Sequence, residues 1–380
     1  MKIAIGVHGR WHAFDLAAGL HRRGHLSRLL TTYPAFIARR FLPADIDVAA
    51  APLLELKRRF YNRFRWGPKP DLDIAKSFGR FAARHLPDEL DLYVGWSSAA
   101  LEVIKSLQPK NIPVILERGS THISHQDTVL AAGYERVGLP YQAIDPGIVP
   151  REQREYELAS AIAVPTEFAA ETFRRNGVPP EKLFVNPYGV DLDRFQPEAQ
   201  KESSGPCRIL FVGGVGVRKG APWLVRAAHS LAGRAEIVMA GPIEDALKSW
   251  LVRNAPPNIV LKGPVPSQEM PGVFGAADVF CLPSLEEGFP LSLLQAMAAG
   301  LPCITTDEAC GGLVKSGENG VLVPSMDETA LAEAMATLAG DPERRHAMGE
   351  AARRTVAEGN SWDDYVDRAV AFYARLTAAA

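Results

Sequence analysis

The amino-acid sequence predicts an α/β protein of two Rossmann-like, doubly wound domains that face each other across a cleft. Its 380 residues are about twice the size of an ordinary domain. Short apolar runs alternate with amphipathic helical runs, as in parallel sheets that helices cover on both faces. The alternation stops at a polar stretch, 192–206, and then starts again. Because ligands of such folds bind at the carboxyl ends of the strands, we expect the functional site in the cleft.

The elements of the first half follow one another from the amino terminus to residue 177. Apolar runs predict strands at 2–7, 91–96, 112–117 and 161–165. Amphipathic runs predict helices at 12–24, 97–107, 152–159 and 166–177. The first of these helices ends at Gly24, a residue type that commonly terminates helices. These elements define a predicted first domain at 1–195.

The second half repeats the pattern with its own elements. We expect strands at 208–214, 236–241, 258–263, 278–283, 302–306 and 320–324. We expect helices at 221–232, 243–253, 267–276, 291–299 and 361–376. The second domain is therefore predicted at 205–360. The amphipathic segment 361–380 is expected to pack back on the first domain.

The composition is that of a globular protein, with 47% apolar and 23% charged residues. The apolar runs are too short or too interrupted to span a bilayer, and the amino terminus has the pattern of a strand rather than a signal peptide. We therefore expect a cytoplasmic chain. No CxxC pair is present, which predicts reduced thiols and no metal site. The four cysteines are Cys207, Cys281, Cys303 and Cys310.

Positive charge is concentrated near the amino terminus. Residues 1–85 contain 16 Lys and Arg against 6 Asp and Glu, which gives +10. The densest part, 53–69, interleaves basic and aromatic residues, namely Lys57, Arg58, Arg59, Arg63, Arg65 and Lys69 with Phe60, Tyr61, Phe64 and Trp66. This mixture favours an anionic membrane surface, on the inner face if the chain is cytoplasmic. The alternative is a solvated helix whose aromatic residues pack on the core. Nucleic acid is disfavoured because no nucleic-acid-binding module accompanies the patch.

A glycine-rich turn, 211–220, lies between a predicted strand and a predicted helix. Free backbone N–H groups and the positive end of a helix favour phosphate at such a place. The turn is not a P-loop, because no Ser or Thr follows Lys219, and its glycine spacing does not fit a dinucleotide fingerprint. Gly213 and Gly214 with the cations Arg218 and Lys219 suit a diphosphate without an obligatory metal. A tight turn with two solvated cations is the alternative.

A second candidate constellation follows the strand predicted at 278–283. Glu287 and Gly288 lie in the turn after this strand, and Pro290 is typical of a helix start. The N–H groups at 288, 289 and the first helical turn should therefore point into the cleft. A carboxylate beside such donors can bind sugar hydroxyls, which donate to it and accept from the backbone. Ordinary helix capping by Glu287 is the alternative.

In their order and spacing, these residues resemble family 4 of the retaining nucleotide-sugar glycosyltransferases, which have the two-domain GT-B fold. The resemblance covers nearly the whole chain. The segments that carry it are GHL (24–26), PYGVDLDRFQP (187–197), FVGG…RKG (211–220), AADVFCLPS (276–284), EEGFPL (286–291), QAMAAGLPCI (295–304) and ENGVLVP (318–324). It implies a first domain that binds the acceptor and a second that binds the nucleotide sugar.

The resemblance also implies roles in donor binding. Glu287 matches the first residue of the family's Glu-x7-Glu pair, and Gln295 stands where the second Glu binds the ribose. Gln295 should bind the ribose more weakly, because an amide has one acceptor oxygen and no charge. Arg218, beside Lys219, should replace an arginine that the family often has at the position of Gly214. The expected donor-binding residues are Gly213, Gly214, Gly288, Phe289, Pro290, Leu291 and Gln295.

The first domain is expected to contribute further residues. The family presents a histidine to the donor sugar near the segment 113–126, and His122 is the candidate, with Arg118 as the alternative. Gly9 and His12 follow the first strand, where the family forms its acceptor-side loop. Gly9, His12 and Arg118 are therefore the expected acceptor-side residues.

The resemblance implies transfer of a sugar from a nucleoside diphosphate sugar to a hydroxyl of a carbohydrate or lipid-linked acceptor, with retention, in polysaccharide or glycolipid assembly. The expected catalytic residues are Arg218, Lys219, Glu287 and His122. No metal or other cofactor is implied, because the cations balance the leaving diphosphate. One alternative is an inactive donor-binding partner of a glycosyltransferase complex, which Gln295 favours. The others are a nucleotide-sugar epimerase or a phosphorylase on the same fold.

Overall fold

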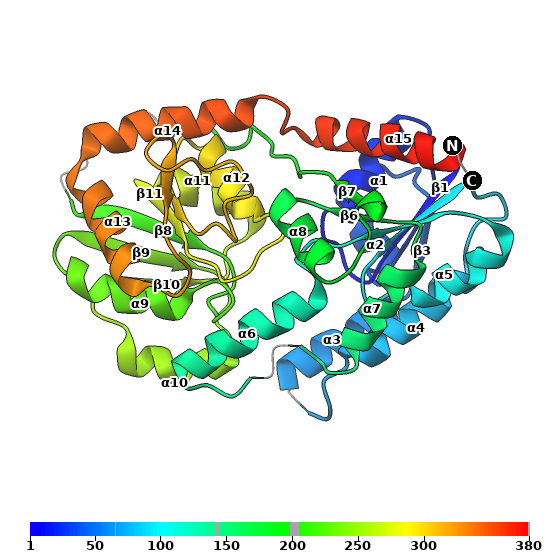
Figure 1. Ribbon diagram of the computed structural model, residues 1–380, viewed down its shortest axis with the longest axis horizontal. Helices are drawn as coiled ribbons and strands as arrows, with labels where there is room; N and C mark the ends of the chain where they lie inside the picture. The colour runs from blue at the N-terminus through cyan, green and yellow to red at the C-terminus, as the bar shows by residue number, and fades with distance from the viewer. Residues whose placement is uncertain (65, 142–143, 198–204, 379–380) are drawn as a thin grey trace.

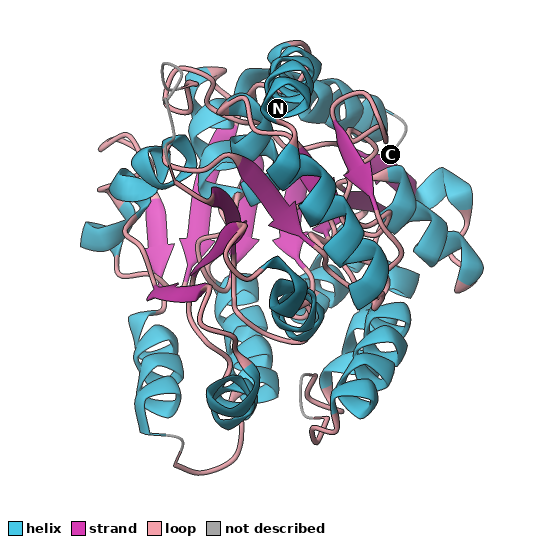
Figure 2. Cartoon of the chain, turned by 90° about the vertical axis from the view of Figure 1, so that its left-hand side faces the viewer, coloured by secondary structure: helices cyan, strands magenta, loops and turns pink. Residues whose placement is uncertain are grey.

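Two parallel sheets, each covered by helices on both faces, form the protein. The computed structural model describes residues 1–64, 66–141, 144–197 and 205–378. The two sheets lie in separate lobes, which we call the first and second units (Figure 1). Figure 2 shows strands of one unit enclosed between layers of helices. The predicted fold class, two doubly wound α/β units, is confirmed.

The sheet of the first unit has seven parallel strands in the order β3-β2-β1-β4-β5-β6-β7. The strands are β1 (Ile3–Val7), β2 (Leu26–Thr31), β3 (Val48–Ala50), β4 (Leu92–Trp96), β5 (Val114–Glu117), β6 (Ala161–Val164) and β7 (Leu183–Val185). All residues of β1, β4, β5 and β6 are buried, because helices cover both faces of the sheet. These four strands are the ones that the sequence predicted. The other three are short or half-buried and carry a weaker apolar signal.

The helices of this unit connect the strands and cover the sheet. They are α1 (Ala13–Arg22), α2 (Ala35–Ala38), α3 (Pro52–Phe64), α4 (Asp71–Arg84), α5 (Leu101–Leu107), α6 (Ile123–Val137), α7 (Ile148–Leu158) and α8 (Glu167–Arg175), with 3-10 turns at Gln108–Lys110 and Pro180–Lys182. Helix α5 begins four residues later than predicted, because Ser98 has a positive φ of 72°. The sequence analysis did not predict α6. Its buried side includes Gln126, Gly133 and Tyr134, which do not form an apolar stripe.

The second sheet contains the six strands that the sequence predicted. They are β8 (Cys207–Val212), β9 (Ala235–Ala240), β10 (Ile259–Gly263), β11 (Val279–Leu282), β12 (Cys303–Thr305) and β13 (Gly320–Leu322), in the order β10-β9-β8-β11-β12-β13. The helices around it are α9 (Ala221–Ala228), α10 (Asp245–Asn254), α11 (Met270–Gly275), α12 (Leu291–Ala298), α13 (Glu328–Gly340) and α14 (Pro342–Ala357), with 3-10 turns at His229–Leu231 and Ser267–Glu269. The sequence analysis missed α13 and α14.

Helix α15 (Trp362–Ala378) returns from the second unit and lies along α1 of the first (Figure 1). Arg22 pairs with Asp363 at 2.8 Å, and Arg23 pairs with Asp367 at 2.7 Å. Phe372 of α15 stacks on Phe184 of β7, with ring centroids 4.1 Å apart. The carboxyl-terminal helix therefore completes the packing of the amino-terminal unit. The polar stretch between the units lies in part, at 198–204, outside the described residues.

Helix α6 provides a second connection, because it reaches from the first unit to the second (Figure 1). A Cβ atom at Gly133 would lie 2.4 Å from Leu285 and 3.2 Å from Val217, so the helix packs closely against these two residues of the second unit. Tyr134, the next residue, donates a hydrogen bond to Glu244. Among the helices of the described residues, none is long and apolar enough to cross a membrane.

We expect Gly189→Ala to destabilise the protein. A Cβ atom at Gly189 would lie 2.3 Å from the backbone nitrogen of Trp362 and 2.4 Å from the backbone carbon of Ser361, where the chain crosses into α15. Backbone atoms cannot move aside cheaply, so the cost should be about 1–3 kcal/mol, seen as a lower thermal midpoint. Gly272→Ala is the control, because open space surrounds that position. An unchanged midpoint for Gly189→Ala would contradict the close approach.

Candidate functional site

Three loops meet where the two units face each other. They are the part of the glycine-rich turn that follows β8, at 213–220, the loop after β11, at 283–290, and the loop after β5, at 118–122. Each follows the carboxyl end of a parallel strand, the usual place of ligand sites in such sheets. Contacts between the loops are direct: a Cβ atom at Gly220 would lie 1.9 Å from the carbonyl oxygen of Pro283. One at Gly288 would lie 2.3 Å from the carbonyl oxygen of Gly119.

The glycine-rich turn holds Lys219 over its own backbone. Gly213 has a φ of 148°, and a Cβ atom there would lie 3.5 Å from Cε of Lys219. A side chain on Gly241 is excluded as well, because its Cβ would lie 1.8 Å from the carbonyl oxygen of Gly213. Gly214 is exposed and faces open space. The turn is therefore compact beneath the lysine and open beside it.

Lys219 and Glu287 come together in the cleft. The lysine Nζ lies 2.5 Å from Oε1 of Glu287, and both side chains are largely buried. The next residues in the loop are fixed by the first unit, since the Thr166 hydroxyl donates to the carbonyl oxygen of Gly288 at 3.0 Å. A cation and a carboxylate thus stand side by side at the boundary between the units.

The remaining predicted donor-binding residues continue from this loop into α12. Phe289 and Pro290 are buried. Leu291 and Gln295 are half-buried and stand one turn apart on the same side of the helix. The predicted residues of the second unit therefore follow a continuous path from the ion pair along the start of α12.

Arg218 binds a partner that the sequence analysis did not consider. Its Nε donates to Glu286 at 2.8 Å, whereas Glu287 lies 3.6 Å from its terminal nitrogen. Glu286 is fully buried and also accepts hydrogen bonds from Ser120 and Thr121 of the first unit. Burial alone would raise the pKa of Glu286, but Arg218 and these hydrogen bonds hold it well below its usual range. Two adjacent glutamates after an apolar strand were the only sequence signal for this residue.

His122 lies inside the first unit. It caps α6 through Nδ1, which accepts from the N–H of Ser124 at 3.2 Å. Its ring packs against Tyr156 and Phe173, with centroids 5.0 and 5.1 Å away. Burial, assisted by Arg118, lowers the pKa of His122 to about 4. The structure therefore does not bring this side chain to Lys219 and Glu287, because helix capping and aromatic packing hold it in the core.

The other predicted residues of the first unit are also engaged. Arg118 is buried, donates to Gln126 at 2.8 Å and pairs with Glu152 at 3.0 Å. His12 is buried and lies 3.4 Å from Glu117. A Cβ atom at Gly9 would lie 2.9 Å from the indole nitrogen of Trp11, so a larger residue at this position would clash with the indole ring.

Two family models match the chain in succession. A glycosyl transferase 4-like domain matches residues 9–189, and a group 1 glycosyl transferase domain matches residues 206–341. The chain belongs to the family 4, group 1 glycosyl transferases. The resemblance predicted from its motifs is therefore confirmed.

Individual family members share part of the sequence and the whole fold. An Escherichia coli K12 protein named for colanic acid biosynthesis is 31% identical over 200 residues, 49% of each chain. A D-inositol 3-phosphate glycosyltransferase of Kineococcus radiotolerans is 31% identical over 271 residues, 60% of each chain. The chain spans about half to two thirds of the length of the first curated relatives it matches.

Solved structures show the same architecture. Sucrose-phosphate synthase from Thermosynechococcus elongatus superposes with a TM-score of 0.75 at 19% identity, over all of both chains. HepE of Anabaena, solved in complex with UDP-glucose, superposes with a TM-score of 0.72 at 14% identity, over 99% of this chain and 100% of that one. At these identities the likeness shows the GT-B fold.

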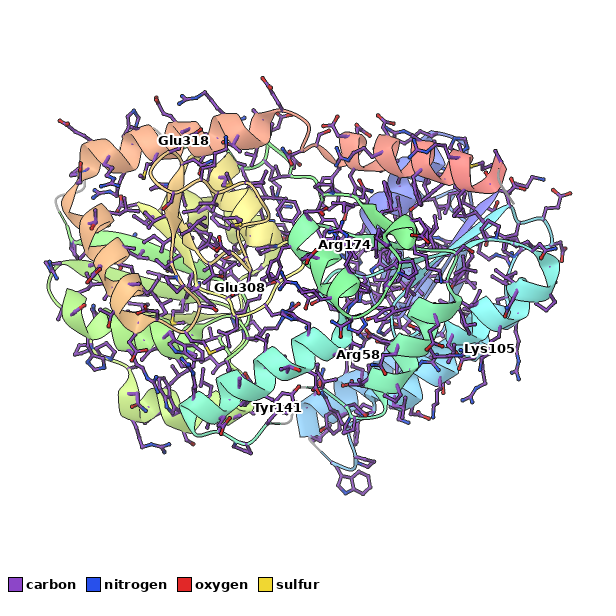
Figure 3. The ribbon with its side chains drawn as sticks, in the orientation of Figure 1. Arg58, Lys105, Tyr141, Arg174, Glu308 and Glu318 are labelled. Carbon is purple, nitrogen blue, oxygen red and sulfur yellow. The ribbon has the colours of Figure 1, made fainter. Side chains whose placement is uncertain are left out.

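The first unit contains a pocket of about 260 Å³ beside the loop at 118–122. Eight of its thirteen lining residues are charged or polar, and the other five are Trp11 and four isoleucines. Of these thirteen, the sequence analysis placed only Arg118 among the candidate site residues. The lining residues include His8, Trp11, Arg58, Asp71, Arg118, Gln126, Asp145 and Glu152. Arg58, labelled in Figure 3, extends to it from α3. Burial and Arg58 lower the pKa of His8 to about 4, so its imidazole is neutral near pH 7.

Trp11 stands at this pocket in an unusual backbone conformation. It has a positive φ of 42°, which non-glycine residues adopt at a cost of about 1–3 kcal/mol. Its side chain is nevertheless 62% exposed, so core packing does not compensate for the strain. Such strain in a pocket wall is typical of functional loops.

Helix α3 presents apolar side chains to solvent. Those that are exposed here or just after the helix are Leu53, Leu56, Phe60, Phe64 and Trp66. The exposure of Phe60, Phe64 and Trp66 contradicts the alternative in which these aromatic residues pack on the core, whereas Tyr61 is half-buried. Its basic residues are partly paired: Arg58 and Arg59 contact the buried Glu55, and Lys57 lies 2.5 Å from Asp73. Arg65 lies outside the described residues.

We expect the stability of this protein to fall as the pH decreases from about 6.5 to about 4. His8 and His122 have pKa values of about 4 in the folded protein, whereas an unperturbed histidine has a pKa of 6.5, so the unfolded chain binds protons first. His122→Gln should reduce this pH dependence, measured as the thermal midpoint at half-unit pH steps. The half-exposed His346 offers a control substitution, His346→Gln. An equal decline in His122→Gln and wild type would refute the assignment.

Proposed function

We propose that this protein transfers a sugar from a nucleoside diphosphate sugar to a hydroxyl of a carbohydrate or lipid-linked acceptor, with retention at the anomeric carbon. The observation that carries the proposal is the pairing of Lys219 with Glu287 beside an open glycine turn. A diphosphate needs the cation and the backbone donors, and a sugar needs the carboxylate. Two of its relatives are named a putative colanic acid biosynthesis glycosyltransferase and a D-inositol 3-phosphate glycosyltransferase. We therefore infer a carbohydrate or lipid-linked acceptor for this protein.

Lys219 is the main catalytic residue of this proposal. The bond between the anomeric carbon and the diphosphate breaks in the transition state, and negative charge grows on the leaving oxygen. The lysine already lies over the turn where the diphosphate would bind, so its stabilisation costs little reorganisation. A metal is not needed in this scheme, because the lysine and backbone N–H groups of the turn balance the charge.

Glu287 would exchange its ion pair for hydrogen bonds from sugar hydroxyls. Lys219, released from Glu287, would contact the diphosphate from its present place over the turn, so donor binding prepares both halves of the donor site. Gln295, half-buried on the first turns of α12, would bind the ribose with its amide oxygen. Arg218 is committed to Glu286, so Lys219 rather than the pair carries the diphosphate.

The pocket of the first unit is our proposed acceptor site. An exposed indole can stack on a sugar ring, and the carboxylates of Asp71 and Asp145 can accept from its hydroxyls. Arg58 joins this pocket to α3, the helix with the exposed apolar residues. A lipid-linked acceptor could therefore enter from an anionic membrane on which α3 lies. We place the protein in the cytoplasm, peripheral on the inner face of the membrane.

A panel of nucleotides tests the donor site. We expect one of UDP, GDP, ADP or TDP to raise the thermal midpoint by several degrees, because a ligand that binds only the folded state stabilises it. NAD and ATP are the negative controls. Lys219→Ala should abolish the shift and lower turnover by about 10²–10³-fold, while the fold stays intact. Lys248→Ala, which removes an exposed lysine paired with Asp245, is the matched control.

The outcomes distinguish the candidate functions. A nucleotide shift with transfer to an added acceptor supports the proposal. A shift with interconversion of the free nucleotide sugar indicates an epimerase, and dependence on inorganic phosphate indicates a phosphorylase. Nucleotide binding with no turnover, either in the wild type or in Gln295→Glu, supports the inactive partner. The absence of a shift with every nucleotide contradicts the donor site.

Flotation with liposomes tests the membrane surface. We expect the protein to float with vesicles that contain anionic phospholipid, and the double substitution Phe60→Ser, Phe64→Ser to reduce the bound fraction severalfold. These rings lie 4.8 Å apart and are both exposed on α3, so they can insert together. Val252→Ser, at an exposed valine of the second unit, is the control. Equal flotation of the double variant and wild type would remove α3 from the proposal.

A further inference from the structure

Glu286 is bonded more extensively than any substrate-binding role in the proposed reaction requires. Its two carboxylate oxygens accept from the N–H and hydroxyl of Thr121 at 2.9 and 2.7 Å, from the hydroxyl of Ser120, and from the amide of Gln126 at 2.9 Å. All of these donors belong to the first unit. Arg218 of the second unit adds a charge-assisted bond at 2.8 Å. The carboxylate is fully buried and is saturated with donors from both units.

The two neighbouring glutamates therefore do different things. Glu287 faces Lys219 of its own unit, whereas Glu286 faces the loop at 118–122 of the other. Around this point the backbones of the two units touch, at Gly119 and Gly288. The loop that carries Glu287 is thus fixed to the first unit by the residue before it. A rotation of one unit away from the other would have to break the Glu286 bonds.

The hydrogen-bond network continues from Glu286 to the pocket of the first unit. Gln126 donates to Glu286 and accepts from Arg118 at 2.8 Å. Arg118 in turn pairs with Glu152 at 3.0 Å. These three residues of the first unit, Gln126, Arg118 and Glu152, line the pocket. One wall of the pocket and the turn that carries Lys219 are therefore connected through the carboxylate of Glu286, and also through the hydroxyl of Ser120, which accepts from Gln126 at 3.1 Å and from Arg218 at 3.2 Å.

We propose that Glu286 is a positioning residue that sets the closed arrangement of the two units, and that Arg218 acts through Glu286 rather than on the donor. Glu286 is fully buried whereas the Arg218 side chain is 37% exposed, so loss of Arg218 would leave a buried carboxylate without its cation, and loss of the Glu286 charge would remove the acceptor that holds the two units together. The catalytic consequence of closure rests on the function proposed above, since closure would align the pocket of the first unit with Lys219 and Glu287. The nucleotide itself would bind to the second unit with or without closure.

The first test uses the full chain without any substrate. Hydrogen exchange followed by mass spectrometry should show loss of protection in peptides covering 118–126 when Glu286→Gln removes the charge, with exchange about tenfold or more faster. The N–H of Thr121 is a direct donor to Glu286, so it reports the bond itself. Glu244→Gln is the matched control, because Glu244 also contacts the first unit, at Tyr134 near the other end of α6. Unchanged protection at 118–126 in Glu286→Gln would overturn the proposal.

The second test separates positioning from donor binding. Arg218→Gln and Glu286→Gln should each lower turnover at least tenfold, while the affinity for the nucleoside diphosphate that stabilises wild type stays within about threefold. The turnover of the double variant should be close to that of the less active single variant, because the two residues share one ion pair. An Arg218→Gln variant that loses nucleotide affinity tenfold, with Glu286→Gln unaffected, would return Arg218 to the diphosphate site. If wild type binds no nucleotide, the donor proposal fails while the exchange experiment still decides the role of Glu286.

Discussion

The arrangement of the cleft depends on one buried carboxylate that draws hydrogen bonds from both units. A fully desolvated glutamate is unfavourable unless its oxygens are saturated, and Glu286 achieves this only when the loop at 118–122 and Arg218 are both in place. The low pKa of Glu286 has the same origin, because the donors stabilise the charged form more than burial disfavours it. The contact between the two units and the charged state of Glu286 therefore depend on the same set of hydrogen bonds.

The glycines at the cleft serve the same end by letting backbones meet. Gly288 lies against Gly119, Gly220 against Pro283, and Gly241 against Gly213, each at a distance that a Cβ atom would not permit. The first contact joins the two units, and the other two keep the loops of the second unit compact under Lys219. Lys219 lies over these contacts, and open space remains beside it at the exposed Gly214. The proposed donor site is thus built on tight backbone packing.

The first unit differs in character from the second. It has a polar pocket with a strained, exposed tryptophan and a helix whose apolar residues face solvent. Both features lie on the side of the sheet where β1, β4 and β5 end or next to it. Arg58 belongs to both, since it pairs with Glu55 on α3 and lines the pocket. The proposed membrane surface and the proposed acceptor site would in this way share one side chain.

The sequence by itself determined the fold class, the family and the six strands of the second unit. Parallel strands buried on both faces give continuous apolar runs, and a turn such as FVGG…RKG is a local pattern, so Lys219 and Glu287 could be found from their neighbours in the chain. Tertiary structure decided what each side chain contacts. His122 had the pattern of a loop ligand but caps α6, and Arg218 had that of a phosphate ligand but pairs with Glu286. The bonds of Glu286 join residues more than 65 positions apart, and no local pattern encodes such a meeting, because it exists only once two independently formed sheets have packed together.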